Sequence, residues 1–256
     1  MNTTRPFRNS PGLPPGGAAI LRWTPEQQVI GYWQREKIDP VRAVGRGADV
    51  RRLPLAIQQI SPHWNWQGKA MDVDSYMAFQ RTSGVAVLKN GQVILERYGL
   101  GRTSQDRWVS ASSAKSVTAI LIGAAIQDRC IKGMDSLVTE YIPELQGSAY
   151  DGVTIHQLLT MTTGIMWNED YTDPNSDDAQ VFSSPFVDGI DPVVAYMRKL
   201  PRACAPGTNF QYKTGDSNVA GILVANAVGR SLSEYLSEKV WQPFGMEQDA
   251  FWMVNS

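Results

Sequence analysis

Residues that build many common active sites are scarce in this chain of 256 residues. It has only two cysteines and two histidines. Cys130 and Cys204 lie far apart in the sequence, so a disulfide between them is possible but nothing indicates it. We expect Cys130, which follows an apolar run, to be a core residue. A serine–histidine–aspartate triad would need His63 or His156. His156 falls in an apolar helical pattern that suits a structural histidine.

The short motifs of several other enzyme classes are also absent. The chain contains no Gly-x-Ser-x-Gly elbow, no Walker A or dinucleotide fingerprint, and no His-Glu-x-x-His or Cys-x-x-Cys cluster. We therefore expect neither a catalytic metal nor a cofactor. A net charge of −1, from 24 basic and 25 acidic residues, argues against a generic nucleic-acid binder.

Long hydrophobic runs are missing as well. Residues 1–17 lack the sustained apolar core of a signal peptide, and the apolar run after Lys115 is too short to cross a bilayer. We expect no membrane contact and a cytoplasmic location, with a periplasmic or secreted location left open.

The most informative feature that is present is the tetrad Ser112-Ser113-Ala114-Lys115. Residues at i and i+3 share a helix face, so a hydroxyl and an amine could meet in one cleft. The amine can take the seryl proton only when it is neutral. Because the reference pKa of lysine is about 10.4, burial or nearby positive charge would have to lower it.

The residues around the tetrad predict where it lies. The run 116–126 is apolar on every face, which is typical of a helix buried in a large core. A buried lysine at the start of such a helix is rare unless it is used or paired. The helix N-terminus would also assist a developing oxyanion. The alternative is a surface lysine with serine as N-cap.

A second reactive group, Tyr212, precedes the helical pattern 217–228. With Lys213 beside it and Lys115 near, this tyrosine could have a lowered pKa and relay protons. Taken alone it suits a packed aromatic. Together with Ser112 and Lys115 it supplies what a serine hydrolase without histidine requires.

The rest of the chain has clear local signals. Two strand-like runs, 84–89 and 92–98, are joined by Asn90-Gly91 and predict a hairpin. Thr154 suits an N-cap, and Ser231 opens a capping box. The stretch 133–197 holds eleven acids and no Lys or Arg. It suits either a substrate that carries an ammonium group or, as we favour, an acidic outer surface.

Four segments, taken in order, resemble the serine β-lactamase and penicillin-binding-protein superfamily. They are Ser112–Lys115, Glu140–Leu145, Thr154–Ile165 and Phe210–Tyr212. Residues 150–152 and 168–174 are similar to a class C-like group, the 6-aminohexanoate-dimer hydrolases and related carboxylesterases. The resemblance covers roughly residues 80 to 252.

The resemblance implies the fold and the site. The fold is α/β (α+β), an antiparallel sheet flanked by helices, with a mostly helical subdomain at about 128–208. We expect an irregular N-terminal arm over residues 1–70 and a partial hydrolase domain over 71–256. Ser112 is implied as the acylated nucleophile, Lys115 as proton acceptor and Tyr212 as proton relay. Tyr171 matches a tyrosine that contacts the substrate amide.

Two departures from the family pattern stand out. Many relatives have Tyr-x-Asn where this chain has Tyr212 followed by Thr214. The family's third motif should come well after Tyr212, so Lys213-Thr214-Gly215 is not that motif. Family members usually continue well beyond this length. We therefore expect a C-terminally truncated chain that lacks several sheet strands and is inactive or poorly folded as it stands.

Two functions follow as hypotheses. The first is a serine hydrolase that acts on a linear amide oligomer, a short-chain ester or a β-lactam. Its partner would be a small-molecule amide or ester, with a homodimer left open. The second is a non-catalytic binding or sensor protein of the same fold, or an inactive fragment.

Overall fold

The computed structural model describes residues 12–181, 184 and 189–254. The start of the predicted arm, 1–11, and positions 182–183 and 185–188 of the predicted helical subdomain lie outside the described residues. The helices are η1 (Gly17–Arg22), α1 (Pro25–Trp33), α2 (Arg35–Ile38), α3 (Val73–Gln80), α4 (Ser113–Gln127), η2 (Val138–Glu140), η3 (Pro143–Leu145), α5 (Ile155–Leu159), α6 (Asp177–Val181), α7 (Pro192–Met197), α8 (Thr214–Val228), α9 (Leu232–Leu236) and η4 (Ser237–Trp241). The strands are β1 (Val41–Val44), β2 (His63–Trp66), β3 (Lys69–Asp72), β4 (Gly84–Lys89), β5 (Gln92–Tyr98) and β6 (Ala250–Met253).

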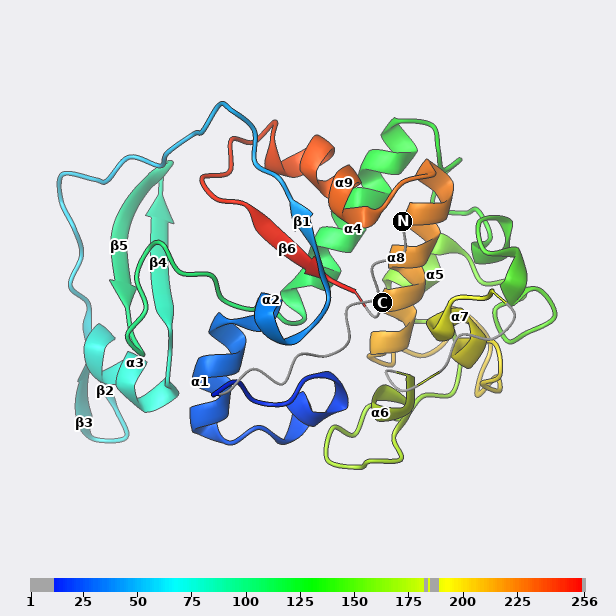
Figure 1. Cartoon of the computed structure of the whole chain (residues 1–256), viewed down its shortest axis with the longest axis horizontal. Coiled ribbons are helices and arrows are strands. Elements are labelled where there is room, and N and C mark those ends of the chain that lie inside the picture. The colour runs from blue at the N-terminus through cyan, green and yellow to red at the C-terminus, as the bar shows by residue number, and fades with distance from the viewer. Residues whose placement is uncertain (1–11, 182–183, 185–188, 255–256) are drawn as a thin grey trace.

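Figure 1 shows the strands β2–β5 with α3 on one side and the helices α4–α9 on the other, with β1 and β6 between them. The described strands form three antiparallel pairs, β1–β6, β2–β3 and β4–β5. The mixed class of helices and antiparallel strands is as predicted, but within the described residues the strands do not join into one sheet.

The β4–β5 hairpin turns where the sequence predicts. Asn90 and Gly91 both have positive φ, 52° and 75°, which is the backbone that a tight two-residue turn needs. The strands pair from Gly84 opposite Tyr98 to Lys89 opposite Gln92, with an irregularity after Val87. The hairpin prediction is confirmed.

The main core lies between α4 and α8. Leu121 and Ile122 of α4 and Val219 and Leu223 of α8 are fully buried in one cluster. This burial removes large aliphatic surfaces from water. The expectation that α4 is buried on every face is wrong, because Ile120 is 57% exposed.

The N-terminal segment is more ordered than predicted. Residues 12–70 contain α1, α2, β1 and β2 in addition to loops, so the description as an irregular arm is corrected for this part of the chain. Strand β1 pairs with β6, from Val41 opposite Met253 to Val44 opposite Ala250. This pairing ties the N-terminal segment to the last described strand. The division at residue 70 stays a prediction.

Helix boundaries follow the predicted caps in two places. Thr154 and Ser231 each form a capping box at the start of α5 and α9. Helix α8 begins at Thr214, three residues before the predicted start, and ends at Val228, where Gly229 with φ 66° is the C-cap. Cys130 is exposed, not in the core, and His156 is exposed, not packed. Cys130 lies just beyond the end of α4, and His156 lies on an exposed side of α5.

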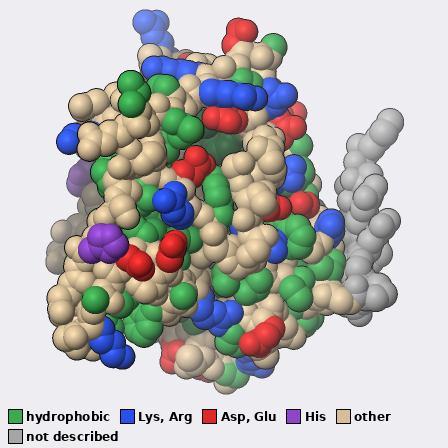
Figure 2. All heavy atoms as spheres, turned by 90° about the vertical axis from the view of Figure 1, so that its left-hand side faces the viewer, with side chains coloured by type: hydrophobic (Ala, Val, Ile, Leu, Met, Phe, Trp, Pro, Cys, Tyr) green, Lys and Arg blue, Asp and Glu red, His purple; other side chains and the backbone are tan. Residues whose placement is uncertain are grey.

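Apolar side chains also reach the surface on the face that carries β2–β5, where Figure 2 shows them among charged groups. They include Trp66 at 42% exposure and Phe79 at 61%, whose ring centroids lie 5.4 Å apart. Among the described helices, none has the length and apolar character that crossing a bilayer would require.

Candidate active site

Ser112 sits at the first turn of α4 with its hydroxyl free for another partner. It is the N-cap residue, but its side chain makes no capping hydrogen bond. The residue before it, Ala111, has φ 44°, a left-handed conformation that costs energy for a non-glycine residue. This sharp turn presents the Ser112 side chain on the surface, where it is exposed.

Lys115 joins Ser112 and Tyr212 in one place. Its Nζ donates a hydrogen bond to the Ser112 Oγ over 3.1 Å. The same Nζ lies 5.0 Å from the centroid of the Tyr212 ring. The structure therefore brings together the three residues that the sequence selected, although their predicted roles are not tested by this geometry. Tyr212 is 37% exposed, so the site is an open surface rather than an enclosed crevice.

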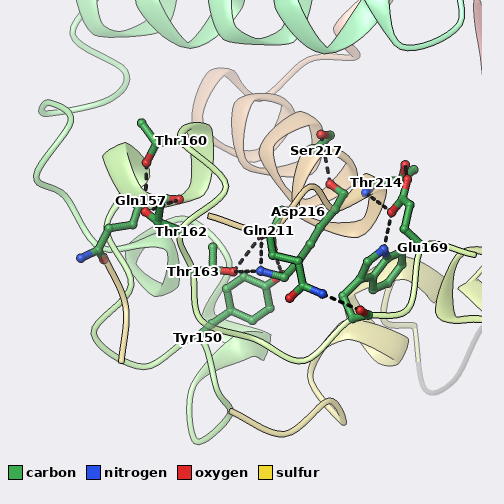
Figure 3. A network of polar contacts seen from close by, with 12 residues as sticks. Tyr150, Gln157, Thr160, Thr162, Thr163, Glu169, Gln211, Thr214, Asp216 and Ser217 are labelled. Carbon is green, nitrogen blue, oxygen red and sulfur yellow. Dashed lines mark hydrogen bonds and ion pairs between the residues drawn. The ribbon is translucent and has the colours of Figure 1, made fainter. Parts of the chain in front are cut away.

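Lys213, in contrast, points away from this cluster. Its ammonium donates to Thr163 Oγ1 over 3.1 Å and lies 3.6 Å from the Asp216 carboxylate. Tyr150 donates to the same carboxylate over 2.8 Å (Figure 3). Lys213 and Asp216 are both fully buried. The Lys213 ammonium is therefore paired inside this buried network, and its effect on Tyr212 stays a prediction.

The network lies at the first turn of α8. Burial raises the pKa of Asp216, while the Lys213 charge and hydrogen bonds from Thr163 and Tyr150 oppose that rise. Gly215 is needed beside it, because a Cβ there would lie 2.5 Å from the Met197 sulfur and 2.8 Å from Trp167. The tripeptide 213–215 thus has a packing role.

Tyr171 is linked to the site through Glu169. Its hydroxyl donates to Glu169 over 2.7 Å, and the other carboxylate oxygen accepts from the Thr214 amide over 2.9 Å. The Glu169 carboxylate also accepts from the Thr214 hydroxyl and the Trp167 indole N–H. Glu169 therefore links Tyr171 to Thr214, the first residue of α8, which follows Tyr212 by two positions. Burial raises the pKa of Tyr171, and the hydrogen bond to Glu169 adds to the rise.

Two acids near Lys115, Glu169 and Asp178, were not among the site residues that sequence reasoning selected. Asp178 is buried and Glu169 is half-buried, so for these two the acidic outer surface is the wrong interpretation. Burial raises the pKa of Asp178 to about 6, Glu169 adds to the rise, and Lys115 opposes it. The only signal in the sequence that could have pointed to these two acids was the density of acids, without Lys or Arg, over residues 133–197. Among the described residues, no group of three His, Cys, Asp or Glu could hold a metal ion.

The raised pKa of Asp178 predicts a pH effect on stability. Its pKa rises from 3.8 to about 6 on folding, so the native state binds this proton more tightly than the unfolded state. The stability that this group contributes is full below about pH 4 and is lost as the pH rises through about 6. We expect Asp178→Asn to gain up to about 3 kcal/mol of unfolding free energy, relative to the unsubstituted protein, between pH 4 and 7.

Urea unfolding of the two proteins at each pH would measure this difference. The matched control is Asp170→Asn, because Asp170 is exposed and the Thr172 hydroxyl lowers its pKa. That variant should show no such gain with rising pH. An Asp178→Asn curve parallel to that of the unsubstituted protein would contradict the assignment.

Comparison with known proteins places this chain in a family. Residues 72–255 match the family described as Beta-lactamase. The chain belongs to the beta-lactamase family. It is 33% identical over 184 residues to the 6-aminohexanoate-dimer hydrolase of Paenarthrobacter ureafaciens, which covers 70% of this chain and 46% of the relative. It is 24% identical over 187 residues to a beta-lactamase of Pseudomonas fluorescens, covering 68% and 48%.

Solved structures show the same fold. A putative 6-aminohexanoate-dimer hydrolase from Bacillus anthracis superposes with a TM-score of 0.77 at 22% identity, covering 90% of this chain and 63% of that one. A putative beta-lactamase from Bacteroides dorei DSM 17855 gives 0.55 at 28% identity, covering 68% and 50%. The chain spans about half the length of the curated relatives it matches. Ser112, Lys115, Tyr171 and Tyr212 all lie within the beta-lactamase family match, whereas α1 and α2 lie before it.

Proposed function

We propose that this protein is a serine hydrolase that cleaves an amide or ester bond through an acyl-enzyme on Ser112. The observation that carries the proposal is the 3.1 Å contact between the Ser112 hydroxyl and the Lys115 amine, beside the Tyr212 ring. A nucleophile and a base within hydrogen-bond reach, with a third group against the base, form the arrangement that covalent catalysis needs.

The reaction proceeds in two steps, acylation of Ser112 and hydrolysis of the acyl-enzyme. The Ser112 oxygen bonds to the substrate carbonyl carbon while its proton passes to the Lys115 amine. The bond to the leaving amine or alcohol then breaks, and Lys115 with Tyr212 returns the proton to that group. Water attacks the acyl-enzyme, gives up a proton by the same route, and releases the carboxylic acid and free Ser112. The backbone amides at the N-terminus of α4 favour the negative oxygen that forms.

Charge near the site favours one class of substrate. The carboxyl group of Asp178 interacts electrostatically with Glu169 and with Lys115, so both acids lie near the amine. Such a site disfavours a substrate with its own carboxylate beside the scissile bond, as β-lactam antibiotics have, and favours a neutral or ammonium-bearing chain. A linear amide oligomer or a short-chain ester therefore fits better. The named activity of the Paenarthrobacter relative, 6-aminohexanoate-dimer hydrolase, agrees with the first of these.

A fluorescent fluorophosphonate probe tests the nucleophile. The protein is treated with the probe, digested, and the labelled peptide identified by mass spectrometry. We expect the phosphonate on Ser112, with loss of fluoride. A label on a different residue would remove Ser112 as nucleophile, and no label with no p-nitrophenyl acetate hydrolysis would favour a non-catalytic binding protein. Kinetics with a linear amino-acid dimer, p-nitrophenyl acetate and a penicillin then rank the substrate classes.

A further inference from the structure

The loop that leads from β5 into α4 is held by the N-terminal helices. This loop, residues 99–111, delivers Ser112 to its position, and Figure 1 shows α1 beside it. Helices α1 and α2 lie outside the segment 72–255 that matches the family. Their contacts with the loop therefore come from outside the matched segment.

Four consecutive loop residues each contact α1 or α2. The Asp106 carboxylate accepts a hydrogen bond from the Trp33 indole N–H over 3.0 Å. Arg107 lies 3.5 Å from the Glu36 carboxylate. The Trp108 ring packs edge-on against the Tyr32 ring, with centroids 5.8 Å apart. The Val109 amide donates to the Tyr32 carbonyl over 3.1 Å.

These contacts differ in strength. The Arg107 pair is solvent-exposed and contributes little. The aromatic contacts matter more, because Tyr32 is itself packed on the buried Trp23, with centroids 5.7 Å apart. The Trp33 ring is also covered by the Arg102 guanidinium at 3.8 Å, from the same loop. Together they fix the loop on α1.

We propose that Tyr32 and Trp33 are positioning residues for Ser112. Only Ser110 and Ala111 separate the last anchored residue from the nucleophile, and Ala111 holds a left-handed φ of 44°. That conformation persists only where the surrounding structure determines it. The anchors on α1 supply this restraint and keep the Ser112 oxygen within reach of Lys115. A displacement of the nucleophile by about 1 Å costs on the order of a hundredfold in rate.

This inference rests on the proposed function, and the reaction of Ser112 with the fluorophosphonate probe separates the two. Tyr32→Ala removes the ring against Trp108 but keeps the backbone carbonyl. We expect its labelling rate and its kcat for p-nitrophenyl acetate to fall at least about tenfold, with KM little changed. Tyr32→Phe keeps the ring and should restore the rate. Trp33→Phe, which loses only the N–H to Asp106, should fall about threefold.

The matched control is Trp66→Ala, an aromatic truncation in the β2–α3 cluster with no contact to the loop in the described structure. It should keep the labelling rate within a factor of about two. Equal rates for Tyr32→Ala and the unsubstituted protein, or an equal loss in Trp66→Ala, would overturn the inference. If Tyr32→Ala fails to fold, Trp33→Phe decides, and an unchanged rate there overturns it. Failure of the unsubstituted protein to label Ser112 would instead overturn the proposed function.

Discussion

Ser112→Ala is expected to lower kcat for p-nitrophenyl acetate by about a thousandfold or more and to abolish phosphonate labelling. The variant keeps the helix and Lys115 but has no oxygen to form the acyl-enzyme. The Ser112 side chain makes no capping hydrogen bond, so its removal should not destabilise α4. Initial-rate kinetics and gel fluorescence of the probe would measure both effects.

The neighbouring serine provides the matched control. Ser113 is exposed at the same helix end, yet its position one residue on turns it away from the face that Lys115 shares with Ser112. Ser113→Ala should keep kcat within a factor of about two. Equal losses in the two variants would show that the helix end, not the Ser112 hydroxyl, determines the activity. Labelling that survives in Ser112→Ala would assign the nucleophile elsewhere.

The parts of the fold that depend on short-range chemistry could be predicted from the sequence. The Asn90-Gly91 turn and the capping boxes at Thr154 and Ser231 are set by neighbouring residues, and they formed where expected. The Ser112–Lys115 contact is equally local, because one helical turn brings the two side chains together.

Features that depend on long-range packing were not predictable in this way. Lys213 and Tyr212 are adjacent in sequence but project in different directions, since Lys213 meets Asp216 and Thr163 in the core. Nothing local distinguishes the buried Asp178 from the less buried acids around it. The order of the N-terminal segment likewise depends on partners far along the chain, as in the pairing of β1 with β6. Single-sequence patterns carry no such information.

Lys213→Met is expected to lower the free energy of unfolding by about 3 to 5 kcal/mol. The substitution keeps a long side chain but leaves the Asp216 carboxylate in the core without its cation. Tyr150 and Thr163 still donate to that carboxylate, each over 2.8 Å, but they supply no net charge. Urea unfolding at pH 7 followed by circular dichroism would measure the loss.

The loss should also depend on pH in a defined direction. Burial raises the pKa of Asp216 even with Lys213 present, and removing the lysine removes the largest opposing cause. The native state of Lys213→Met can therefore relieve the buried charge by taking up a proton. Its deficit relative to the unsubstituted protein should shrink as the pH falls from 7 toward about 5.

A shorter ion pair on the surface is the control for this prediction. Lys132 lies 2.7 Å from Glu140, closer than the 3.6 Å that separates Lys213 from Asp216, but its side chain is 79% exposed. Lys132→Met should cost less than about 1 kcal/mol, because water solvates the Glu140 carboxylate that remains. If distance alone determined the energy, Lys132→Met would be the more damaging change. If Lys132→Met lost as much unfolding free energy as Lys213→Met, or more, burial of Asp216 would not be the reason that the fold needs Lys213.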